Sequence, residues 1–551
     1  MANPFDALRE KAKAAWAAVE TPKRPQIFVG YGIHGQAAGA PDVLDALKRA
    51  LAAKAIAADV HITGGLGLDF AEVIVSIALP GKPRVYFAQV TPEKSRRLVE
   101  EYVATGRAPQ DVTVLGATGK LEGSGNADLF SRPEFKYQRR IVTANCGVTD
   151  PTNIWHYIAG GGYEALRKAL FEMQPAQVIE QVQKSNLRGR GGAAFPAGMK
   201  WKFLHDATVT PKYHLCNSEE GDSGAFNDKH LLEGDPHRVI EGIILGGYAT
   251  RASGGKGFIF IRVGWDLPIT RAQKALDDAY AHGLLGKNIL GTDFSFDIEL
   301  SLTGESYVSG EETALMESVE GKRAMPRYKP PFPAASGLWG KPSNINNVKT
   351  YSYVPSIVAQ GGDWFAGIGT QRSKGTALVC LSGSIAKPGL YEVPFGVTLR
   401  QVIEETGGGG PHGRSLKFLQ TGGPLGGFLP ASSLDMPLDF DGMVAAGAMF
   451  GSGGIIVGDD TVSVPKITAI LAEFNAEESC GKCFPCRVGT RQVADVMERM
   501  THGHGSRAEL DAVMVIGDTM KSSLCAHGQL ADNPIKSGYR YFKSEFDTLL
   551  R

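Results

Sequence analysis

Apolar and polar residues in the first 110 residues follow two kinds of pattern, one typical of strands and one typical of helices. Short apolar or alternating runs predict strands at 26–32, 58–63, 73–79 and 84–90. Helical periodicity covers 1–24, 41–56 and 92–106. The run "PGKP" at 80–83 predicts a turn that joins the last two strands as a hairpin. After the first helix, this β-α-β-β-α order predicts a small α/β domain.

The remainder of the chain separates into three further regions. A polar segment at 117–140 is typical of a linker, and residues 141–330 alternate strands and helices around Gly-rich turns. A small β-α-β unit follows near 375–430, and the last hundred residues are helical in pattern. The expected domains are 1–130, 131–350, 351–435 and 436–551.

Composition and charge narrow the class of protein. Of the 551 residues, 43% are apolar and 21% are charged, as in soluble globular proteins. Lys plus Arg and Asp plus Glu balance at 58 each, which argues against a general nucleic-acid or membrane-surface binder. The N-terminus lacks the apolar core of a signal peptide, and no apolar run is long enough for membrane insertion. A cytoplasmic location is therefore expected.

A cysteine cluster near the C-terminus indicates a metal site. The motif "ESCGKCFPCRVGT" spaces Cys480, Cys483 and Cys486 as C-x2-C-x2-C, and Cys525 stands apart in "SSLCAHGQ". Three close thiolates and one remote thiolate suit a [4Fe–4S] cluster better than zinc, which usually takes two C-x2-C pairs. Zinc remains the alternative. Lys482 would offset the negative charge of a cluster.

A glycine-rich, basic stretch at 186–203 reads "NLRGRGGAAFPAGMKWKF". Its exposed amides, with Arg188, Arg190 and Lys200, would suit a phosphate group. The stretch matches neither a P-loop nor a clean G-x-G-x-x-G motif, so a basic surface loop is an equal alternative on this evidence alone. Three companion stretches favour a binding site: "CNSEEGDSGAF" at 216–226, "YVSGEETALMESVEGKRAMPRYKPPFPA" at 307–334 and "NINNVKT" at 344–350.

Together, these four stretches and the cysteine cluster resemble the flavin-binding subunits of NADH-oxidising complexes. That family includes the 51-kDa subunit of respiratory NADH dehydrogenase, the diaphorase subunit of NAD-reducing hydrogenases and the beta subunit of NAD-dependent formate dehydrogenases. The resemblance covers about residues 140–551. "CNSEEGDSG" is most similar to the formate dehydrogenase version, because respiratory members usually carry Asp where Glu219 stands and Glu where Asp222 stands.

The resemblance implies FMN, NAD(H) and a [4Fe–4S] cluster as cofactors. The residues implied for FMN are Gly189, Arg190, Gly191, Gly192, Lys200, Asn217, Glu219, Glu220, Asp222, Tyr307, Gly310, Glu311, Glu312, Asn346, Asn347 and Thr350. Those implied for NADH are Phe195, Phe203, Lys329 and Phe332. Those implied for the cluster are Cys480, Cys483, Cys486 and Cys525. Aromatic partners suit flat rings and cations suit a pyrophosphate, although each aromatic residue taken singly is equally typical of a core.

The N-terminal region resembles the thioredoxin-like [2Fe–2S] ferredoxins but lacks their ligands. The matching positions hold His34, Gln36 or a neighbour, Gly65 and Asp69, and glycine has no ligand atom. A structural or docking domain is expected, whose partner would be a thioredoxin-like [2Fe–2S] subunit. His34 is favoured as a hydrogen-bonded structural histidine over a metal ligand.

The expected architecture is α/β with four parts. These are an N-terminal thioredoxin-like domain, a central Rossmann-like FMN/NADH domain, a ubiquitin-like β-grasp module and a C-terminal helical bundle with the iron–sulfur cluster. The expected function is the diaphorase subunit of a NAD-dependent formate dehydrogenase. It would exchange hydride between NAD(H) and FMN and single electrons with the cluster.

A molybdenum-containing formate-oxidising subunit with iron–sulfur clusters is the expected partner, in a hetero-oligomer. The alternatives are the flavin subunit of a respiratory NADH dehydrogenase or NAD-reducing hydrogenase, and a non-catalytic scaffold of the same fold.

Overall fold

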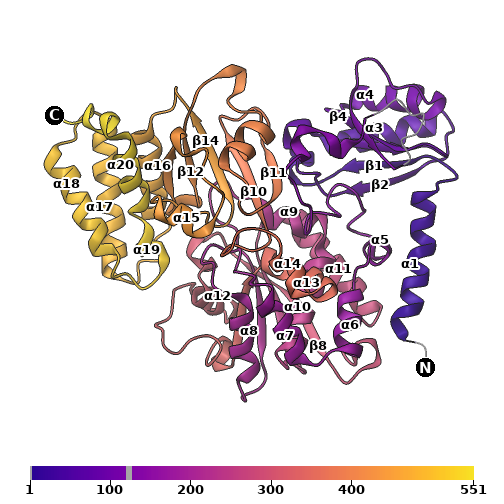
Figure 1. Cartoon of the computed structure of the whole chain (residues 1–551), viewed down its shortest axis with the longest axis horizontal. Helices are drawn as coiled ribbons and strands as arrows, with labels where there is room; N and C mark the ends of the chain where they lie inside the picture. The colour runs from indigo at the N-terminus through magenta and orange to yellow at the C-terminus, as the bar shows by residue number, and fades with distance from the viewer. Residues whose placement is uncertain (1–2, 120–126) are drawn as a thin grey trace.

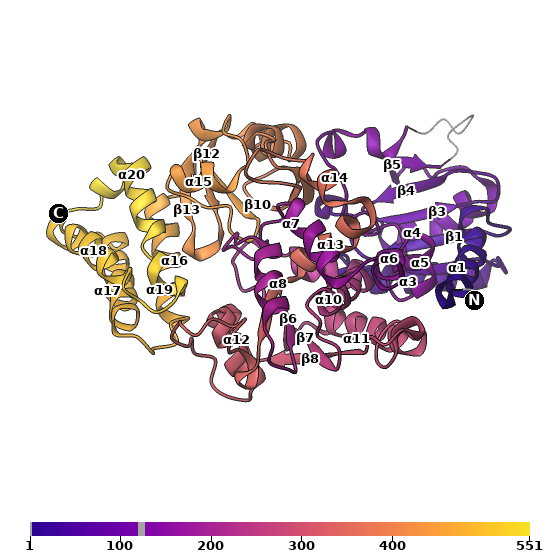
Figure 2. The same cartoon turned by 60° about the horizontal axis from the view of Figure 1, so that its bottom comes forward.

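The computed structural model describes residues 3–119 and 127–551. Within these residues, the N-terminal sheet lies at one end of the long axis of the molecule and the C-terminal helical bundle at the other, with the central and third β-sheets one below the other between them (Figure 1). The central sheet lies between the other two along the chain, and the bundle lies at the opposite end from the N-terminus (Figure 2). Part of the predicted linker, residues 120–126, lies outside the described residues. None of the described helices is both long and apolar enough to cross a membrane.

The N-terminal sheet contains the four predicted strands and one that the sequence pattern did not reveal. Its order is β2-β1-β3-β4-β5, with β1 and β2 parallel and the other neighbours antiparallel. The unpredicted β5 overlaps the start of the expected linker. The assignment of a thioredoxin-like domain to this sheet stays a prediction. Its elements are β1 (Gln26–Gly30), α2 (Ile33–Ala37), α3 (Ala40–Ala53), β2 (Asp59–Thr63), β3 (Val75–Ala78), β4 (Arg84–Ala88), α4 (Pro92–Arg97) and β5 (Thr113–Thr118).

The first helix packs away from that sheet. Helix α1 (Pro4–Glu20) starts at Asn3, whose Oδ1 accepts from the amide of Phe5 at 3.0 Å. Phe5 and Ala12 are fully buried in the hydrophobic core of the following region. The predicted amphipathic helix is therefore confirmed, and its apolar face belongs to the central core.

The central sheet is entirely parallel, in the order β8-β7-β6-β9. Parallel strands need crossovers and covered faces, which explains the alternation of apolar strands and helices across 141–330. The elements are α5 (Ile154–Ala159), α6 (Glu164–Glu172), α7 (Pro175–Lys184), α8 (Ala197–Asp206), β6 (Tyr213–Ser218), α9 (Asn227–Gly234), α10 (Pro236–Ala249), β7 (Gly255–Arg262), α11 (Asp266–Ala281), β8 (Phe296–Thr303), α12 (Glu312–Val319), β9 (Ser343–Asn347), α13 (Val348–Gln360) and α14 (Gly362–Ala366).

The third sheet extends beyond the expected boundary at residue 435. Its order is β11-β10-β14-β12-β13, and β14 lies between β10 and β12. Because a central strand cannot be separated from its sheet, we place the end of this unit after residue 459. The elements are β10 (Thr376–Gly383), β11 (Gly389–Pro394), β12 (Leu416–Thr421), β13 (Gly427–Pro430), α15 (Phe440–Ala445) and β14 (Gly454–Asp459).

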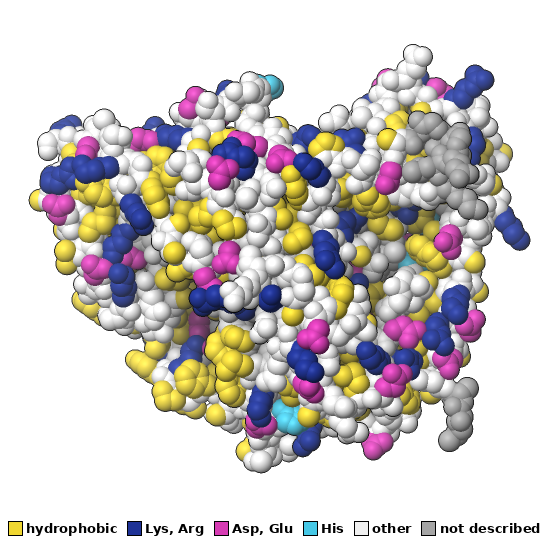
Figure 3. Space-filling view, viewed as in Figure 1, with side chains coloured by type: hydrophobic (Ala, Val, Ile, Leu, Met, Phe, Trp, Pro, Cys, Tyr) yellow, Lys and Arg dark blue, Asp and Glu magenta, His cyan; other side chains and the backbone are white. Residues whose placement is uncertain are grey.

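The C-terminal region is helical, as its pattern predicted. Its core includes Leu471, Met497, Val513 and Phe546, and these residues pack against the third sheet through Phe428. Acidic and basic side chains are interspersed over the face shown in Figure 3, in line with the balanced composition. The helices are α16 (Val464–Glu477), α17 (Phe484–Thr501), α18 (Arg507–Met520), α19 (Ala526–Leu530) and α20 (Asn533–Asp547).

Candidate functional site

The candidate site lies where three strands of the central parallel sheet end. Asn217 on β6 and Asn347 on β9 are register partners, and the Asn347 side chain donates to the carbonyl of Asn217 at 3.2 Å. Asn217 in turn donates to the carbonyl of Gly310 at 2.8 Å, and Arg262 ends β7 beside them. In open parallel sheets, ligands bind at the carboxyl ends of the strands, so this edge is the expected place for one.

The glycine loop between α7 and α8 lies against this edge. Its two sides are joined by the Gly189 amide, which donates to the carbonyl of Phe195 at 2.8 Å. A Cβ on Gly191 would lie 3.0 Å from the Cβ of Asn347, so the loop backbone passes close to the end of β9. Gly192 has φ +112°, and a Cβ there would meet no protein atom closer than 3.9 Å. The loop therefore has one packed side and one open side.

The buried side chain of Arg190 anchors the glycine loop to the protein interior. Its guanidinium is buried, donates to the carbonyls of Arg188 (2.9 Å) and Lys374 (2.6 Å) and lies over the ring of Phe395. Burial lowers the pKa of Arg190 to about 10. Its amide donates to the Thr350 hydroxyl at 2.9 Å. Arg190 and Thr350 thus fix the loop, and the predicted contact of Arg190 with a phosphate is not supported by this inward position.

The three acidic residues that follow β6 make different contacts. Glu219 forms an ion pair with Arg262, with Arg262 Nε 2.7 Å from Glu219 Oε1. Burial raises the pKa of Glu219 to about 7, and the charge of Arg262 opposes this shift. Glu220 accepts from two amides at the start of α9, so it caps that helix. Asp222 accepts from Tyr307 Oη at 2.7 Å and from the Ser452 hydroxyl.

Two buried residues at this edge escaped the sequence analysis. Lys349 is 2% exposed, and its Nζ lies 2.8 Å from Asp228 Oδ1 and 2.5 Å from Asn227 Oδ1. The other oxygen of Asp228 accepts from the Asn347 side chain at 2.5 Å. Lys349 lies inside the quoted motif "NINNVKT", which was the available signal. Asp228 carries no local signal, because it meets Lys349 only through the fold.

A second group of charges surrounds the start of α12. Glu311 caps the helix by accepting from the amides of Thr313 and Ala314. Lys329 Nζ lies 3.1 Å from Glu311 Oε1 and 2.8 Å from Glu312 Oε1. Lys200 Nζ lies 3.2 Å from the other oxygen of Glu312. Burial raises the pKa of Glu312, but the two lysines outweigh it and the net pKa is lowered.

The predicted aromatic residues differ sharply from core residues in exposure. Phe195 is 45% exposed, Phe203 52% and Phe332 61%. These exposed fractions show that the core alternative is wrong for all three, and their contact with NADH stays a prediction. Asn346 is instead interior, because its Oδ1 accepts from the indole of buried Trp201 at 2.9 Å.

Three of the four cysteines of the predicted cluster lie at the starts of two helices, and Cys480 lies in the loop before the first of them. Cys483 immediately precedes α17, Cys486 lies in its first turn, and Cys525 immediately precedes α19. A Cβ on Gly528 would lie 2.8 Å from the Cβ of Cys486, which brings the two helix starts together. Burial raises the pKa of Cys486 to about 11 and that of Cys525 to about 12.

The cysteine arrangement bears on which metal fits. Among the described residues, no three His, Cys, Asp or Glu side chains converge closely enough to hold one metal ion. Four cysteine thiolates are the usual ligands of a [4Fe–4S] cluster, and the same donors also bind zinc. The donor set is therefore compatible with a four-iron cluster.

Tyr307 connects the two candidate cofactor sites. Its hydroxyl donates to Asp222, and its amide donates to Glu478 Oε2 at 2.9 Å, two residues before Cys480. Its ring lies 5.7 Å, between centroids, from that of His527, two residues after Cys525. The edge of the central sheet and the cysteine segment are thus joined through one residue.

The N-terminal positions that would carry cluster ligands face the central unit. His34 Nδ1 lies 2.9 Å from Asp69 Oδ1, in line with a structural histidine. A Cβ on Gly65 would lie 3.2 Å from the imidazole of His230, and the Ile33 amide donates to Glu233 at 3.0 Å. These positions line the contact with α9.

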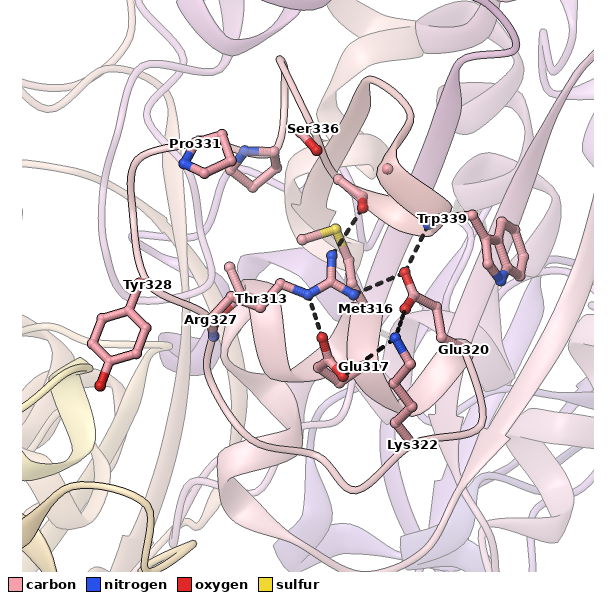
Figure 4. A pocket seen from close by; sticks show the side chains of 13 residues that line it. Thr313, Met316, Glu317, Glu320, Lys322, Arg327, Tyr328, Pro331, Ser336 and Trp339 are labelled. Carbon is pink, nitrogen blue, oxygen red and sulfur yellow. Dashed lines mark hydrogen bonds and ion pairs between the residues drawn. The ribbon is translucent and has the colours of Figure 1, made fainter.

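A cavity of about 580 Å³ lies beside α12 (Figure 4). It contains none of the residues predicted for FMN. Its lining residues are Thr313, Met316, Glu317, Glu320, Lys322, Arg327, Tyr328, Pro331, Pro333, Ser336, Gly337, Trp339 and Gly340.

Three family models match the chain in order. Residues 182–356 match the Nuo51 FMN-binding domain, residues 378–429 the SLBB domain, and residues 466–549 the NADH-ubiquinone oxidoreductase-F iron-sulfur binding region. FMN, NAD(H) and a [4Fe–4S] cluster are accordingly the cofactors of this chain. The matched flavin region contains the glycine loop and the carboxyl ends of β6, β7 and β9.

Individual proteins and a crystal structure are also similar to this chain. The NADP-reducing hydrogenase subunit HndC of Solidesulfovibrio fructosivorans is 46% identical over 75% of this chain and 84% of its own length. A NADH-quinone oxidoreductase subunit of Rhizobium meliloti is 44% identical over 74% of this chain and 96% of its own length. The crystal structure of NAD+-reducing [NiFe]-hydrogenase in the H2-reduced state covers 99% of this chain and 90% of its own, at 27% identity and a TM-score of 0.66.

These matches bear on the expected formate dehydrogenase assignment. They confirm a NADH-dependent oxidoreductase subunit of a multi-subunit type, and they favour the hydrogenase and NADH dehydrogenase alternatives over the formate dehydrogenase beta subunit. With the glycine loop, the strand-end asparagines and the cysteine segment assembled as described, the chain belongs to the 51-kDa family of flavin-binding subunits of NADH-oxidising complexes.

Proposed function

We propose that the chain exchanges a hydride between NAD(H) and FMN and exchanges single electrons with the [4Fe–4S] cluster, as the diaphorase subunit of a larger complex. The observation that carries this proposal is Tyr307, whose contacts join the strand-end edge to the cysteine segment. FMN supplies the conversion between two-electron and one-electron transfer that nicotinamide and the cluster require. The protein's own task is to bind, orient and stabilise these groups.

For FMN, the fit rests on the open side of the glycine loop. A Cβ on Gly192 would meet no protein atom closer than 3.9 Å, and Asn217 and Asn347 border that loop at the strand ends. Lys200 supplies the cation that Arg190 does not. Gly310 packs closely on Glu219. A Cβ at position 310 would lie only 2.8 Å from Glu219 Oε2, so a side chain there would disturb this contact. The proposed FMN-contacting residues also include Tyr307, Glu311, Glu312 and Thr350. Three other predicted residues are proposed to support the site indirectly, by holding the residues next to them: Asn346, Glu220 and Asp222.

For NAD(H), the exposed aromatic residues supply stacking surfaces. Phe195 and Phe203 lie at the glycine loop and on α8, and Phe332 follows Lys329 on the segment after α12. Lys329 provides a charge for the pyrophosphate or ribose. The cluster ligands are proposed to be Cys480, Cys483, Cys486 and Cys525.

The parent complex is proposed to be of the NAD-linked hydrogenase type. The supporting observations are that the hydrogenase structure covers 99% of this chain and that HndC, which is 46% identical, is also a hydrogenase subunit. The N-terminal sheet would then dock a thioredoxin-like [2Fe–2S] subunit. A formate dehydrogenase with a molybdenum subunit is the second candidate, which the string "CNSEEGDSG" favours.

Two measurements test this proposal. The isolated full chain should reduce a dye with NADH as electron donor, and a folded chain that contains FMN but shows no such activity would refute the hydride step. Purification of the tagged chain from its native cells, followed by metal analysis of the proteins that accompany it, separates the two complexes. Nickel supports the hydrogenase type and molybdenum the formate dehydrogenase type.

A further inference from the structure

The segment 322–340, which we call the strap, connects α12 to β9 and carries Lys329 and Phe332. It contains no strand and only a single helical turn at Leu338–Gly340. Tyr328 and Phe332 in its middle are 72% and 61% exposed, whereas Pro326, Pro333 and Leu338 are buried. The cavity of about 580 Å³ lies between the strap and α12 (Figure 4). Apolar packing therefore does not fix residues 328–332 over the cavity, and their position depends on polar contacts.

Arg327 makes those contacts across the cavity. Its Nε pairs with Glu317 and its Nη2 lies 2.8 Å from Glu320 Oε1, both on or just after α12. Its Nη1 donates to the carbonyl of Gly337 at 2.8 Å, and its amide donates to the Thr313 hydroxyl at 2.8 Å. Figure 4 shows the guanidinium between these partners. One side chain thus joins the start of the strap, its far end and the helix.

The same helix also fixes the far end of the strap and the charged group of the candidate site. Glu320 Oε1 accepts from the amide of Trp339 at 2.7 Å. At the other end of α12, Glu311 and Glu312 hold Lys329. Residues 328–336 are consequently tied to one helix at both ends, and Pro333, next to Phe332, is also held by β9, because its carbonyl accepts from the Ser343 amide at 2.8 Å.

We propose that Arg327 is a positioning residue for NAD(H). It orders the strap before the nucleotide binds, so that Lys329 and Phe332 are already in place. A binding loop that must be ordered by its ligand lowers affinity, because part of the binding free energy is then used for ordering. The proposal rests on the proposed function, since it takes the strap to be part of the nucleotide site. Arg327 itself contacts α12 and strap backbone, and it is not assigned a chemical step.

Arg327→Met and Arg327→Lys in the full chain, loaded with FMN and iron, test the proposal. Lys322→Met is the matched control, because Lys322 lies 2.7 Å from Glu320 and 3.9 Å from Glu317 but makes no contact with the far end of the strap. Lysine at 327 keeps the charge but lacks the planar fork that reaches several partners at once.

The expected result is a split between KM and kcat. Arg327→Met should raise KM for NADH about tenfold or more, with kcat within about threefold of wild type and unchanged FMN content. Arg327→Lys should fall between, and Lys322→Met should match wild type. Hydrogen exchange over residues 324–336 should accelerate in Arg327→Met and leave the glycine loop unaffected.

Several outcomes would overturn the proposal. An Arg327→Met protein with KM within twofold of wild type and unchanged exchange in the strap would do so, as would an equal rise of KM in Lys322→Met. If Arg327→Met does not fold, Arg327→Lys decides by the same two readouts. If wild type itself does not oxidise NADH, the proposed function fails, and hydrogen exchange alone still shows whether Arg327 orders the strap.

Discussion

Substitution of Gly192 by alanine probes the open side of the glycine loop. The backbone there has φ +112°, a region that L-residues rarely adopt, so the change should cost about 1–2 kcal/mol of stability. The new methyl group would meet no protein atom within 3.9 Å, so steric clash adds nothing in the flavin-free chain. A loss of stability of this size should lower Tm by about 2–8 °C.

The effect on FMN should be larger than the effect on folding. The methyl group projects from the open side of the loop, where FMN is proposed to bind, and each lost hydrogen bond to a charged phosphate costs about 1.5–3 kcal/mol. The Kd for FMN should therefore rise about ten- to hundredfold. Titration of the flavin-free chain with FMN, followed by quenching of flavin fluorescence, measures this change.

A matched glycine separates the two effects. Gly39 has φ +99° and no atom within 4 Å of an added Cβ, but it lies before α3 in the N-terminal sheet region. Gly39→Ala should lose a similar amount of stability and keep the wild-type Kd for FMN. Equal Kd values for Gly192→Ala and Gly39→Ala would refute the placement of flavin at this loop.

Three further predictions address the cluster and the buried acid. Cys525→Ser should lower bound iron well below four per chain while FMN stays bound, as measured by iron and flavin analysis; full iron content would contradict the ligand assignment. Lys482→Met should lower the cluster potential by some tens of millivolts in an EPR-monitored titration, because a nearby cation stabilises the more negative reduced state; an unchanged potential would contradict this. Because burial raises the pKa of Glu219 to about 7, its contribution to stability is complete below its unfolded pKa of about 4.3 and is lost as pH rises through 7. Unfolding of the flavin-free Glu219→Gln protein should lack this decline, which amounts to about 3 kcal/mol between pH 4 and 8, and a pH-independent difference from wild type would refute the shift.

Local periodicity predicted most elements of the N-terminal region and failed where pairing is distant. Helices such as α1 and α3 have one apolar face, which a single segment reveals. β5 and β14 contain glycine, and β14 gains its place from β10 and β12, which precede it by more than 30 residues. A strand whose neighbours lie far along the chain carries little local signal.

The motifs located the candidate site better than they assigned its roles. Asn217, Asn347 and the glycine loop do meet at one sheet edge. Arg190, however, turns into the interior, and Lys349 pairs with Asp228 from another element. Which cation faces a ligand and which supports the fold depends on tertiary contacts, so residue type and spacing could not decide it.

The central claim is that one chain holds FMN beside a four-iron cluster. Anaerobic titration of the purified full chain with NADH, with FMN, iron and zinc counted on the same sample, tests it most directly. The account predicts about one FMN and four iron atoms per chain, with the flavin absorbance bleached by NADH. A folded chain without flavin, or with zinc at the four cysteines, would contradict it.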